Sequence, residues 1–264
     1  MFFMKNIKIG PSGIGPVKEA IPNLEDFHRL NFKMCEIAFT YGIYMHNDKD
    51  AEEIGKHAKK LGIELTIHAP YWINLNSLEK RKIQESKIRI LECCKIGERL
   101  GAGIVVFHAG FYGNKKDGAK EECYENIKKE IIEMQEEIKK NKWKIKIAPE
   151  TMGKVNVFGS AEEISRLVKD TGCSFCIDFA HILAREKKVD YEKIKKLFPQ
   201  KEWHCHFSGI QYSEKGERNH INLKKEQWKE LFENLPKDKE IEIICESPDR
   251  LRDCVEGLEV LKKI

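Results

Sequence analysis

The sequence predicts an α/β fold, a single domain that spans residues 1–264 and forms a (β/α)8 barrel. Three observations predict it. Short apolar runs alternate with charged amphipathic stretches, which is the order of parallel strands joined by helical crossovers. About eight such pairs follow one another, and 264 residues is the size of such a barrel. The length alone also fits two small domains, but no linker or change of composition divides the chain.

The apolar runs are the predicted strands. Each is short and mostly β-branched or aromatic, as expected of a strand that is buried on both faces. The runs cover residues 7–10, 34–39, 65–69, 104–108, 145–148, 174–178, 203–207 and 241–245.

The stretches between the runs are predicted to be helices. In the stretch 50–61, apolar residues fall on one helical face. The same spacing recurs in 121–140 and in a long run that begins after Ser77. We expect Ser77 to cap the helix formed by that run. Ser160 opens a shorter helix with Glu163 three residues later, a capping box. The stretches 223–235 and 249–263 complete the series, and the predicted C-terminal caps are Gly62, Gly101 and Gly172.

An open, doubly wound sheet is the alternative to a barrel. It would normally carry a glycine-rich phosphate loop directly after its first strand. The segment 10–16 is rich in glycine but lacks the required spacing and ends in Pro16, so we interpret it as a loop. The barrel remains the prediction.

The composition restricts the cellular compartment and the partners that we expect for the protein. No apolar run approaches the roughly 20 residues of a membrane span, so no membrane partner is expected. Nine cysteines, an odd number in a long chain, argue against a disulfide framework and for a reducing, cytoplasmic setting. The net charge of +4 neither demands nor excludes a nucleic-acid partner.

The ends of six successive predicted strands carry acidic residues or histidines. In a barrel these carboxyl ends form the rim where active sites lie. Gathering such groups without a counter-charge would be costly, and carboxylates with imidazoles are the ligands of zinc or manganese. The sequence therefore predicts a metal site at the rim, built from His68, His108, Glu150, Asp178, His181, His206, His220 and Glu246.

The number of candidate ligands favours more than one ion. A single catalytic zinc takes about three protein ligands and keeps one position open. Glu150 stands in the middle of the series and could bridge two ions. Two ions about 4 Å apart can hold a hydroxide and stabilise both oxygens of an in-line phosphoryl displacement.

The rim motifs resemble those of endonuclease IV, a zinc-dependent apurinic/apyrimidinic endonuclease with a xylose isomerase-like TIM barrel. The resemblance runs from about Ile7 to the C-terminus and lies in the ordered motifs at 68–75, 107–110, 149–151, 176–181, 206–208 and 246–248. It implies cleavage of double-stranded DNA on the 5′ side of abasic sites, by a zinc-activated hydroxide, in DNA repair.

The same resemblance implies three zinc ions, and the cofactor that we expect is two or three Zn²⁺ ions, with Mn²⁺ also possible. It assigns the first ion to His68, His108 and Glu150, and the second to Glu150, Asp178, His206 and Glu246. His181 and His220 belong to the third. Glu150 and Glu246 are the expected catalytic carboxylates.

The third site departs from the family pattern. The family has an Asp two residues before the histidine that corresponds to His220, and this chain has Arg218 there. Glu217 is adjacent and could turn inward instead. A one-metal or two-metal centre therefore remains open.

Aromatic residues surround the predicted rim. The family places polar residues after its second strand to contact DNA, whereas this chain has Tyr41 and Tyr44. Tyr71 and Trp72 stand where the family inserts side chains into the duplex, and inserted aromatics can stack where a base is missing. The same residues could instead line a pocket for a sugar.

A sugar isomerase or ketose epimerase of the same superfamily is the main alternative. Such epimerases hold one metal with Glu, Asp, His and Glu of the last four strands, a set that Glu150, Asp178, His206 and Glu246 also match. Arg218, near the site, suits a sugar hydroxyl, whereas His68 and His108 exceed what one metal needs. A divergent barrel that binds metal or ligand without nuclease activity is a third possibility.

Basic residues that could contact DNA phosphates are few. Lys115 and Lys116 follow the fourth strand, and Lys187 and Lys188 follow the sixth, all on the expected face. The lysine-rich segment 139–144 precedes a strand and is expected on the opposite face, as solvated surface.

Overall fold

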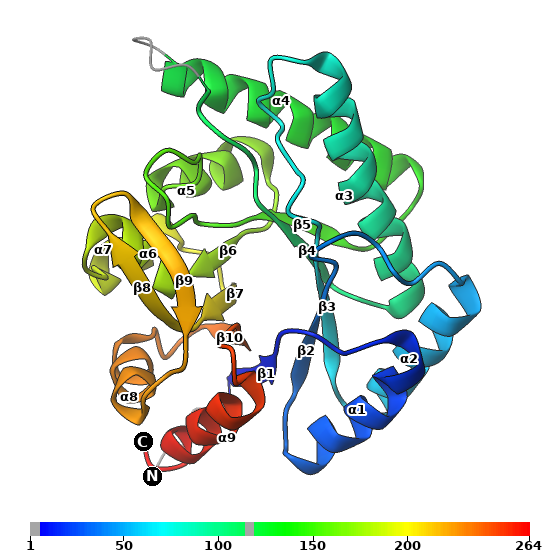
Figure 1. The fold of residues 1–264 in the computed structure, drawn as a ribbon, viewed down its shortest axis with the longest axis vertical. Helices are drawn as coiled ribbons and strands as arrows, with labels where there is room; N and C mark the ends of the chain where they lie inside the picture. Colours follow the sequence, from blue (N-terminus) through cyan, green and yellow to red (C-terminus); the bar gives the residue numbers. More distant parts are fainter. Residues whose placement is uncertain (1–5, 114–118) are drawn as a thin grey trace.

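The computed structural model describes residues 6–113 and 119–264 (Figure 1). In these residues the parallel strands stand in two sheets, in the order β1-β10-β7-β6 and β2-β3-β4-β5. Backbone bridges between Ser12 and Glu36 and between Glu150 and Cys176 join the two sheets into a ring. The strands are β1 (Ile7–Pro11), β2 (Met34–Ala38), β3 (Glu64–His68), β4 (Ile104–Phe107), β5 (Lys146–Pro149), β6 (Cys176–Asp178), β7 (Glu202–Phe207) and β10 (Glu240–Cys245). The predicted (β/α)8 barrel is confirmed.

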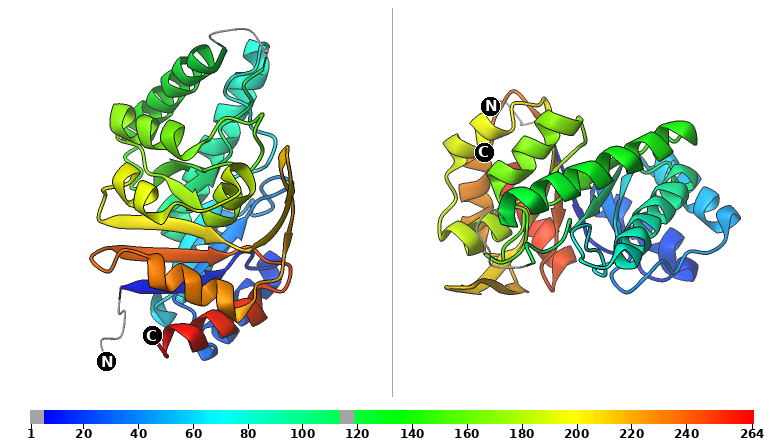
Figure 2. Two further views of the ribbon diagram at one scale, coloured as in Figure 1. Left: turned by 90° about the vertical axis from the view of Figure 1, so that its left-hand side faces the viewer. Right: turned by 90° about the horizontal axis from the view of Figure 1, so that it is seen from above.

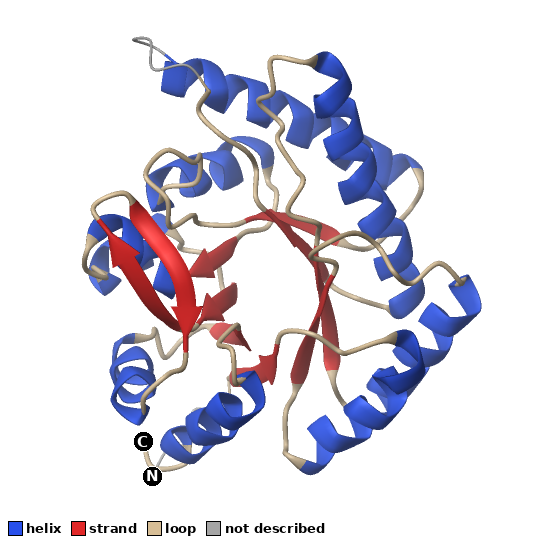
Figure 3. Ribbon diagram, in the orientation of Figure 1, coloured by secondary structure: helices blue, strands red, loops and turns tan. Residues whose placement is uncertain are grey.

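Helices form an outer layer around this ring (Figure 3). The capping box of Ser160 and Glu163 is present, and all three predicted C-cap glycines, at 62, 101 and 172, adopt the left-handed conformation. The helices are α1 (Val17–Arg29), α2 (Asp48–Leu61), α3 (Lys80–Leu100), α4 (Ala119–Lys140), α5 (Ala161–Thr171), α6 (Phe179–Glu186), α7 (Tyr191–Leu197), α8 (Lys225–Asn234) and α9 (Arg250–Leu261).

The prediction that Ser77 caps the third helix is wrong. Helix α3 begins at Lys80, and its N-cap residue is Glu79. The Ser77 hydroxyl instead accepts a hydrogen bond of 3.2 Å from the Glu79 backbone N–H, which shapes the turn before the helix.

An antiparallel hairpin interrupts the alternation after β7. It consists of β8 (Gly209–Ser213) and β9 (Gly216–Ile221), and it lies at the edge of the molecule, beyond the carboxyl end of β7 (Figure 2). The segment was not among the predicted strands, because its partly exposed residues give no apolar run.

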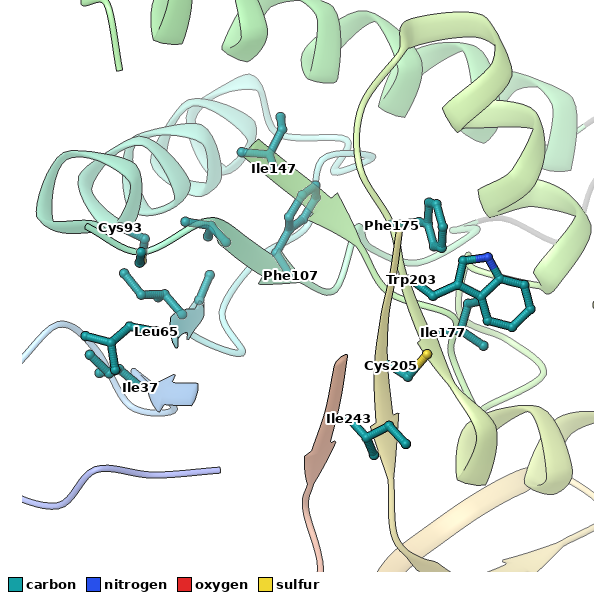
Figure 4. Close-up of a cluster of buried hydrophobic side chains, with 14 of the residues drawn as sticks. Ile37, Leu65, Cys93, Phe107, Ile147, Phe175, Ile177, Trp203, Cys205 and Ile243 are labelled. Atoms are coloured by element: carbon teal, nitrogen blue, oxygen red, sulfur yellow. The ribbon is translucent and has the colours of Figure 1, made fainter. Parts of the chain in front are cut away.

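The main hydrophobic core lies between the ring and the helices. Strand residues such as Ile37, Phe107 and Cys205 pack there against helix residues such as Cys93 (Figure 4). Because side chains of a strand alternate between its two faces, the neighbours of these residues point into the barrel. His204 and His206 flank Cys205 in this way, and the same alternation positions the candidate metal centre.

No helix of the described residues has both the length and the hydropathy that crossing a membrane requires.

Candidate metal centre

The first cluster joins the ends of three neighbouring strands. His68 is the last residue of β3, His108 follows β4 and Glu150 follows β5. One carboxylate oxygen, Glu150 Oε2, lies 3.3 Å from His68 Nε2 and 3.0 Å from His108 Nε2. The three ligand atoms therefore converge on one point, as a metal ion requires.

The second cluster shares Glu150 with the first. His206 Nδ1 lies 3.4 Å from Glu150 Oε1 and 3.5 Å from Glu246 Oε2. Asp178 completes the set, and one ligand atom of each of the four residues lies within 4.8 Å of the others. Because Glu150 presents one oxygen to each cluster, it is placed to bridge two ions.

The third cluster consists of His181, Glu217 and His220. Asp178 caps helix α6 by accepting a 2.6 Å hydrogen bond from the His181 backbone N–H, which fixes the start of that helix beside the second cluster. His181 Nε2 lies 3.5 Å from Glu217 Oε2, and the Ser208 hydroxyl lies 2.9 Å from His220 Nδ1.

A β-bulge explains why Glu217 occupies this position. Tyr212 pairs with Glu217, whereas its neighbour Gln211 pairs with Asn219, so Arg218 is an extra residue in β9. In a regular strand, residues three apart face opposite sides. Because of the extra residue, the side chains of Glu217 and His220 point to the same side of the strand. Arg218 itself is exposed.

Close backbone contact beneath the hairpin also holds Glu217 in place. A Cβ atom on Gly153 would lie 2.7 Å from Glu217 Cβ and 3.1 Å from His181 Cδ2. Gly216, with φ of +95°, packs against the Gly153 carbonyl. Only a residue without a side chain fits between the two ligands, and Gly153 was not among the predicted site residues.

The donor set fits divalent cations such as zinc. Among the described residues, Glu150 Oε1, Asp178 Oδ2 and His206 Nδ1 are buried atoms without a hydrogen-bond partner, and all three belong to the second cluster. Buried polar atoms without partners lower the stability of the folded protein. We therefore expect a bound cation that accepts lone pairs from several of these atoms. Nitrogen and oxygen donors in sets of three or four are typical of zinc and also suit manganese.

Charges in the centre shift the protonation of its members. Burial alone would oppose ionisation of Glu150, but the charges of His108 and His206 hold the pKa of its carboxyl well below the usual range. Burial also disfavours the His68 imidazolium, yet the hydrogen bond to Glu150 and nearby carboxylates raise the pKa of His68 to about 9. Burial raises the pKa of Asp178 to about 6. The proton that His68 keeps near neutral pH therefore offsets part of the negative charge that a bound cation would otherwise offset.

Glu36 is a buried residue of the centre that sequence reasoning missed. Its Oε2 lies 3.1 Å from His206 Nε2, so it orients the imidazole whose Nδ1 faces the second cluster. The signal was an acidic residue inside an otherwise apolar strand, β2.

A pocket of about 720 Å³ lies beside the first and second clusters, and its lining includes His68, Tyr71, His220 and Glu246. The Tyr71 ring stacks on His108, with centroids 5.3 Å apart and planes 12° apart. Arg250, at the start of α9, also lines this pocket and was not predicted.

The other predicted contact residues lie outside the clusters. Tyr41 and Trp72 are exposed, by 86% and 62%, on the loops that follow β2 and β3. Lys187 donates hydrogen bonds to the carbonyls of Ala184 and Ser213, which ties it to the protein surface. Lys115 and Lys116 lie outside the described residues.

Comparisons with known proteins agree with the observed fold. Residues 24–264 match a family model described as xylose isomerase-like TIM barrel. A protein of Methanocaldococcus jannaschii described as uncharacterized is 32% identical over 237 residues, which are 83% of this chain and 84% of that protein. A probable endonuclease 4 of Thermoplasma volcanium is 33% identical over 121 residues, which are 45% of this chain and 40% of that protein.

Solved structures that are named as an endonuclease and as an epimerase-like protein both share the fold of this chain. Endonuclease IV of Thermus thermophilus superposes with a TM-score of 0.70 at 19% identity, over 97% of this chain and 98% of the other. A D-tagatose 3-epimerase-like protein superposes with a TM-score of 0.72 at 21% identity, over 97% of this chain and 96% of the other. At these identities the likeness concerns the fold alone.

Proposed function

The chain belongs to the xylose isomerase-like TIM barrel family, and on this premise we propose that it is a metal-dependent phosphodiesterase of the endonuclease IV type. Its substrate is double-stranded DNA, which it cleaves on the 5′ side of abasic sites. The observation that carries the proposal is the set of three ligand clusters around Glu150. An epimerase with one metal needs the second cluster only, which leaves the two others without a role.

The residues divide among two or three zinc ions, with manganese as the alternative metal. His68 and His108 hold the first ion together with Glu150, which also belongs to the second set with Asp178, His206 and Glu246. His181, Glu217 and His220 hold the third. When bound, such ions lower the pKa of water and offset negative charge on phosphoryl oxygens.

The chain itself supplies the shape and the orientation of the site. Tyr71 is held against His108 by stacking, and it lines the pocket. We propose that Tyr71, Trp72 and Tyr41 contact the duplex around the abasic position, where aromatic side chains can stack. Arg218 projects from the bulge into solvent, and we propose that it contacts phosphate.

A ketose epimerase or sugar isomerase is the second candidate. The pocket of about 720 Å³ beside Glu246 supports it, because that volume falls in the range of small-molecule sites. For that activity, Glu150 and Glu246 would exchange a proton with a carbon beside a carbonyl. Arg218, the residue expected to contact a sugar hydroxyl, faces solvent and is not among the residues that line this pocket.

A cleavage assay separates the two candidates. The zinc-loaded protein should nick a duplex that contains a tetrahydrofuran abasic analogue and leave an undamaged duplex intact. A chelator should abolish nicking. Glu150→Gln should lower the rate more than about 100-fold, because it weakens a shared ligand.

Glu202→Gln is the matched control, since Glu202 begins β7 at the opposite end of the barrel and should leave the rate unchanged. Metal-replete protein that leaves the abasic strand intact while it epimerises a ketose would overturn the proposal.

A further inference from the structure

A second group of metal-ligating side chains lies one layer deeper in the barrel. Cys176 precedes Asp178 by two residues, and His204 precedes His206 by two, so each pair points to the same side of its strand. Cys176 and His204 are register partners in β6 and β7, as Asp178 and His206 are above them. The inner layer therefore repeats the geometry of the rim.

The ligand atoms of this layer converge. One ligand atom from each of Cys176, His204 and His206 lies within 4.8 Å of the other two. Glu36 Oε2 approaches both histidines, at 3.1 Å from His206 Nε2 and 3.7 Å from His204 Nε2. None of these four residues is more than 3% exposed.

Three buried atoms of the group have no hydrogen-bond partner: Glu36 Oε1, His204 Nε2 and His206 Nδ1, the last of which faces the second rim cluster. The outer nitrogen of the His204 ring, Nδ1, faces Glu242 Oε2 at 3.1 Å, an arrangement that leaves Nε2 free to bind inward. The surroundings of Cys176 are otherwise apolar, since it packs with Val106 and Ala148. Unsatisfied polar groups in such a layer are costly unless something binds them.

We propose that Glu36, Cys176, His204 and His206 form an interior metal site, separate from the three clusters of the rim. Cys176, His204 and His206 supply one thiolate and two imidazoles that converge, and Glu36 Oε2, which approaches both imidazoles, is the candidate fourth ligand of a structural zinc site. His206 connects this site to the rim, because its Nδ1 faces the second cluster and its Nε2 faces Glu36. Binding displaces the thiol proton of Cys176 to solvent, and when the second rim cluster is also occupied it displaces the remaining N–H proton of His206, whose two nitrogens then both face metal.

A cavity lies at the end of the barrel opposite the rim. Its volume is about 1150 Å³, and its lining includes Thr66, His204 and Glu242. His204 thus lies between that cavity and the interior group. The cavity therefore brings solvent close to the outer side of His204, at the end of the barrel away from the rim.

Cobalt substitution tests the proposal. The three rim clusters contain no cysteine, so a thiolate-to-cobalt charge-transfer band in the near-ultraviolet reports the interior site alone. The Co²⁺-loaded wild-type protein should show the band. Cys176→Ala should abolish it and lower the bound metal by one ion per chain, and this change should be tolerated because Cys176 already packs against Ala148.

Matched controls keep the test independent of DNA cleavage. Cys205→Ala, which alters a buried cysteine on the outer face of β7 (Figure 4), should keep the band, and so should Glu150→Gln. His204→Gln should weaken the band while Cys176 stays in place, which covers the case in which Cys176→Ala fails to fold. A wild-type protein without the band, or a band that survives Cys176→Ala, would overturn the site.

Discussion

Glu150 is the residue that two of the rim clusters share. Its two oxygens face different partners, His68 and His108 on one side and His181 and His206 on the other. Among the described residues, each of the other rim ligands belongs to one of the three clusters. Substitution of this single side chain is therefore expected to affect both rim ions, whereas a change at any other rim ligand affects one rim ion directly.

Ser208 is a positioning residue for the third cluster. Its hydroxyl lies 2.9 Å from His220 Nδ1, so it fixes the ring whose other nitrogen is free to bind metal. We predict that Ser208→Ala lowers metal affinity at the third cluster by about 10- to 100-fold, the usual effect of losing such a partner. Bound metal after equilibration at limiting zinc measures this.

Ser165→Ala is the control for that change. The Ser165 hydroxyl of α5 donates to the Leu197 carbonyl of α7, neither residue belongs to a ligand cluster, and the loss of this bond should leave metal binding unaltered. Equal metal content in Ser208→Ala and wild-type protein would show that His220 needs no such support.

At the scale of elements, the hairpin β8–β9 carries two of the third cluster's ligands, Glu217 and His220. The family resemblance placed Arg218 at the expected ligand position, two residues before His220, which is a spacing that an unbroken strand brings to one side. The bulge shifts that relation by one residue and presents Glu217 instead. A bulge depends on pairing with β8 and on the contact between Gly153 and Gly216, neither of which a local pattern reveals.

Because of the bulge, we expect substitutions at the neighbouring residues 217 and 218 to differ in their effect on metal content. Glu217→Gln should lower metal content by one ion per chain, since it removes a charged ligand from the third cluster. Arg218→Asp, which recreates the family spacing, should not increase metal content, because residue 218 faces solvent. Elemental analysis of the two purified variants beside the wild type decides between them.

If Arg218→Asp gained an ion while Glu217→Gln kept all of its metal, the bulge would not exist in solution. The third cluster would then have to be rebuilt around residue 218.

At the scale of the whole molecule, the eight-fold alternation and the rim followed from the sequence because both depend on local pattern. Strand runs such as 104–108 and caps such as Gly101 are signals of a few residues. The pairing of Glu36 with His206 was not accessible in this way. It joins β2 to β7 across the inside of the barrel, a contact between segments that share no local pattern.

At the junction between β1 and β2, which we call the seam, the two backbones lie so close together that one added methyl group tests their contact. A Cβ atom on Gly10 would lie 1.8 Å from the Met34 carbonyl oxygen, so Gly10→Ala must displace one of the strands. We predict a loss of about 1–3 kcal/mol in the free energy of unfolding, the usual cost of overpacking. Denaturant unfolding measures it.

Gly103→Ala is the matched control, because nothing lies within 4 Å of a Cβ atom at that position and its φ is not positive. It should leave stability unchanged or raise it slightly. Equal stability of the Gly10→Ala and Gly103→Ala proteins would contradict the closed seam.

The identity of the cut ends tests the central claim most directly. A duplex with one tetrahydrofuran abasic analogue and a label on each end of the damaged strand is incubated with the zinc-loaded protein, and the products are sized and offered to a DNA polymerase. The account predicts one break on the 5′ side of the abasic position and a 3′-hydroxyl that the polymerase extends. An uncut strand, or a break on the 3′ side that cannot be extended, would contradict it.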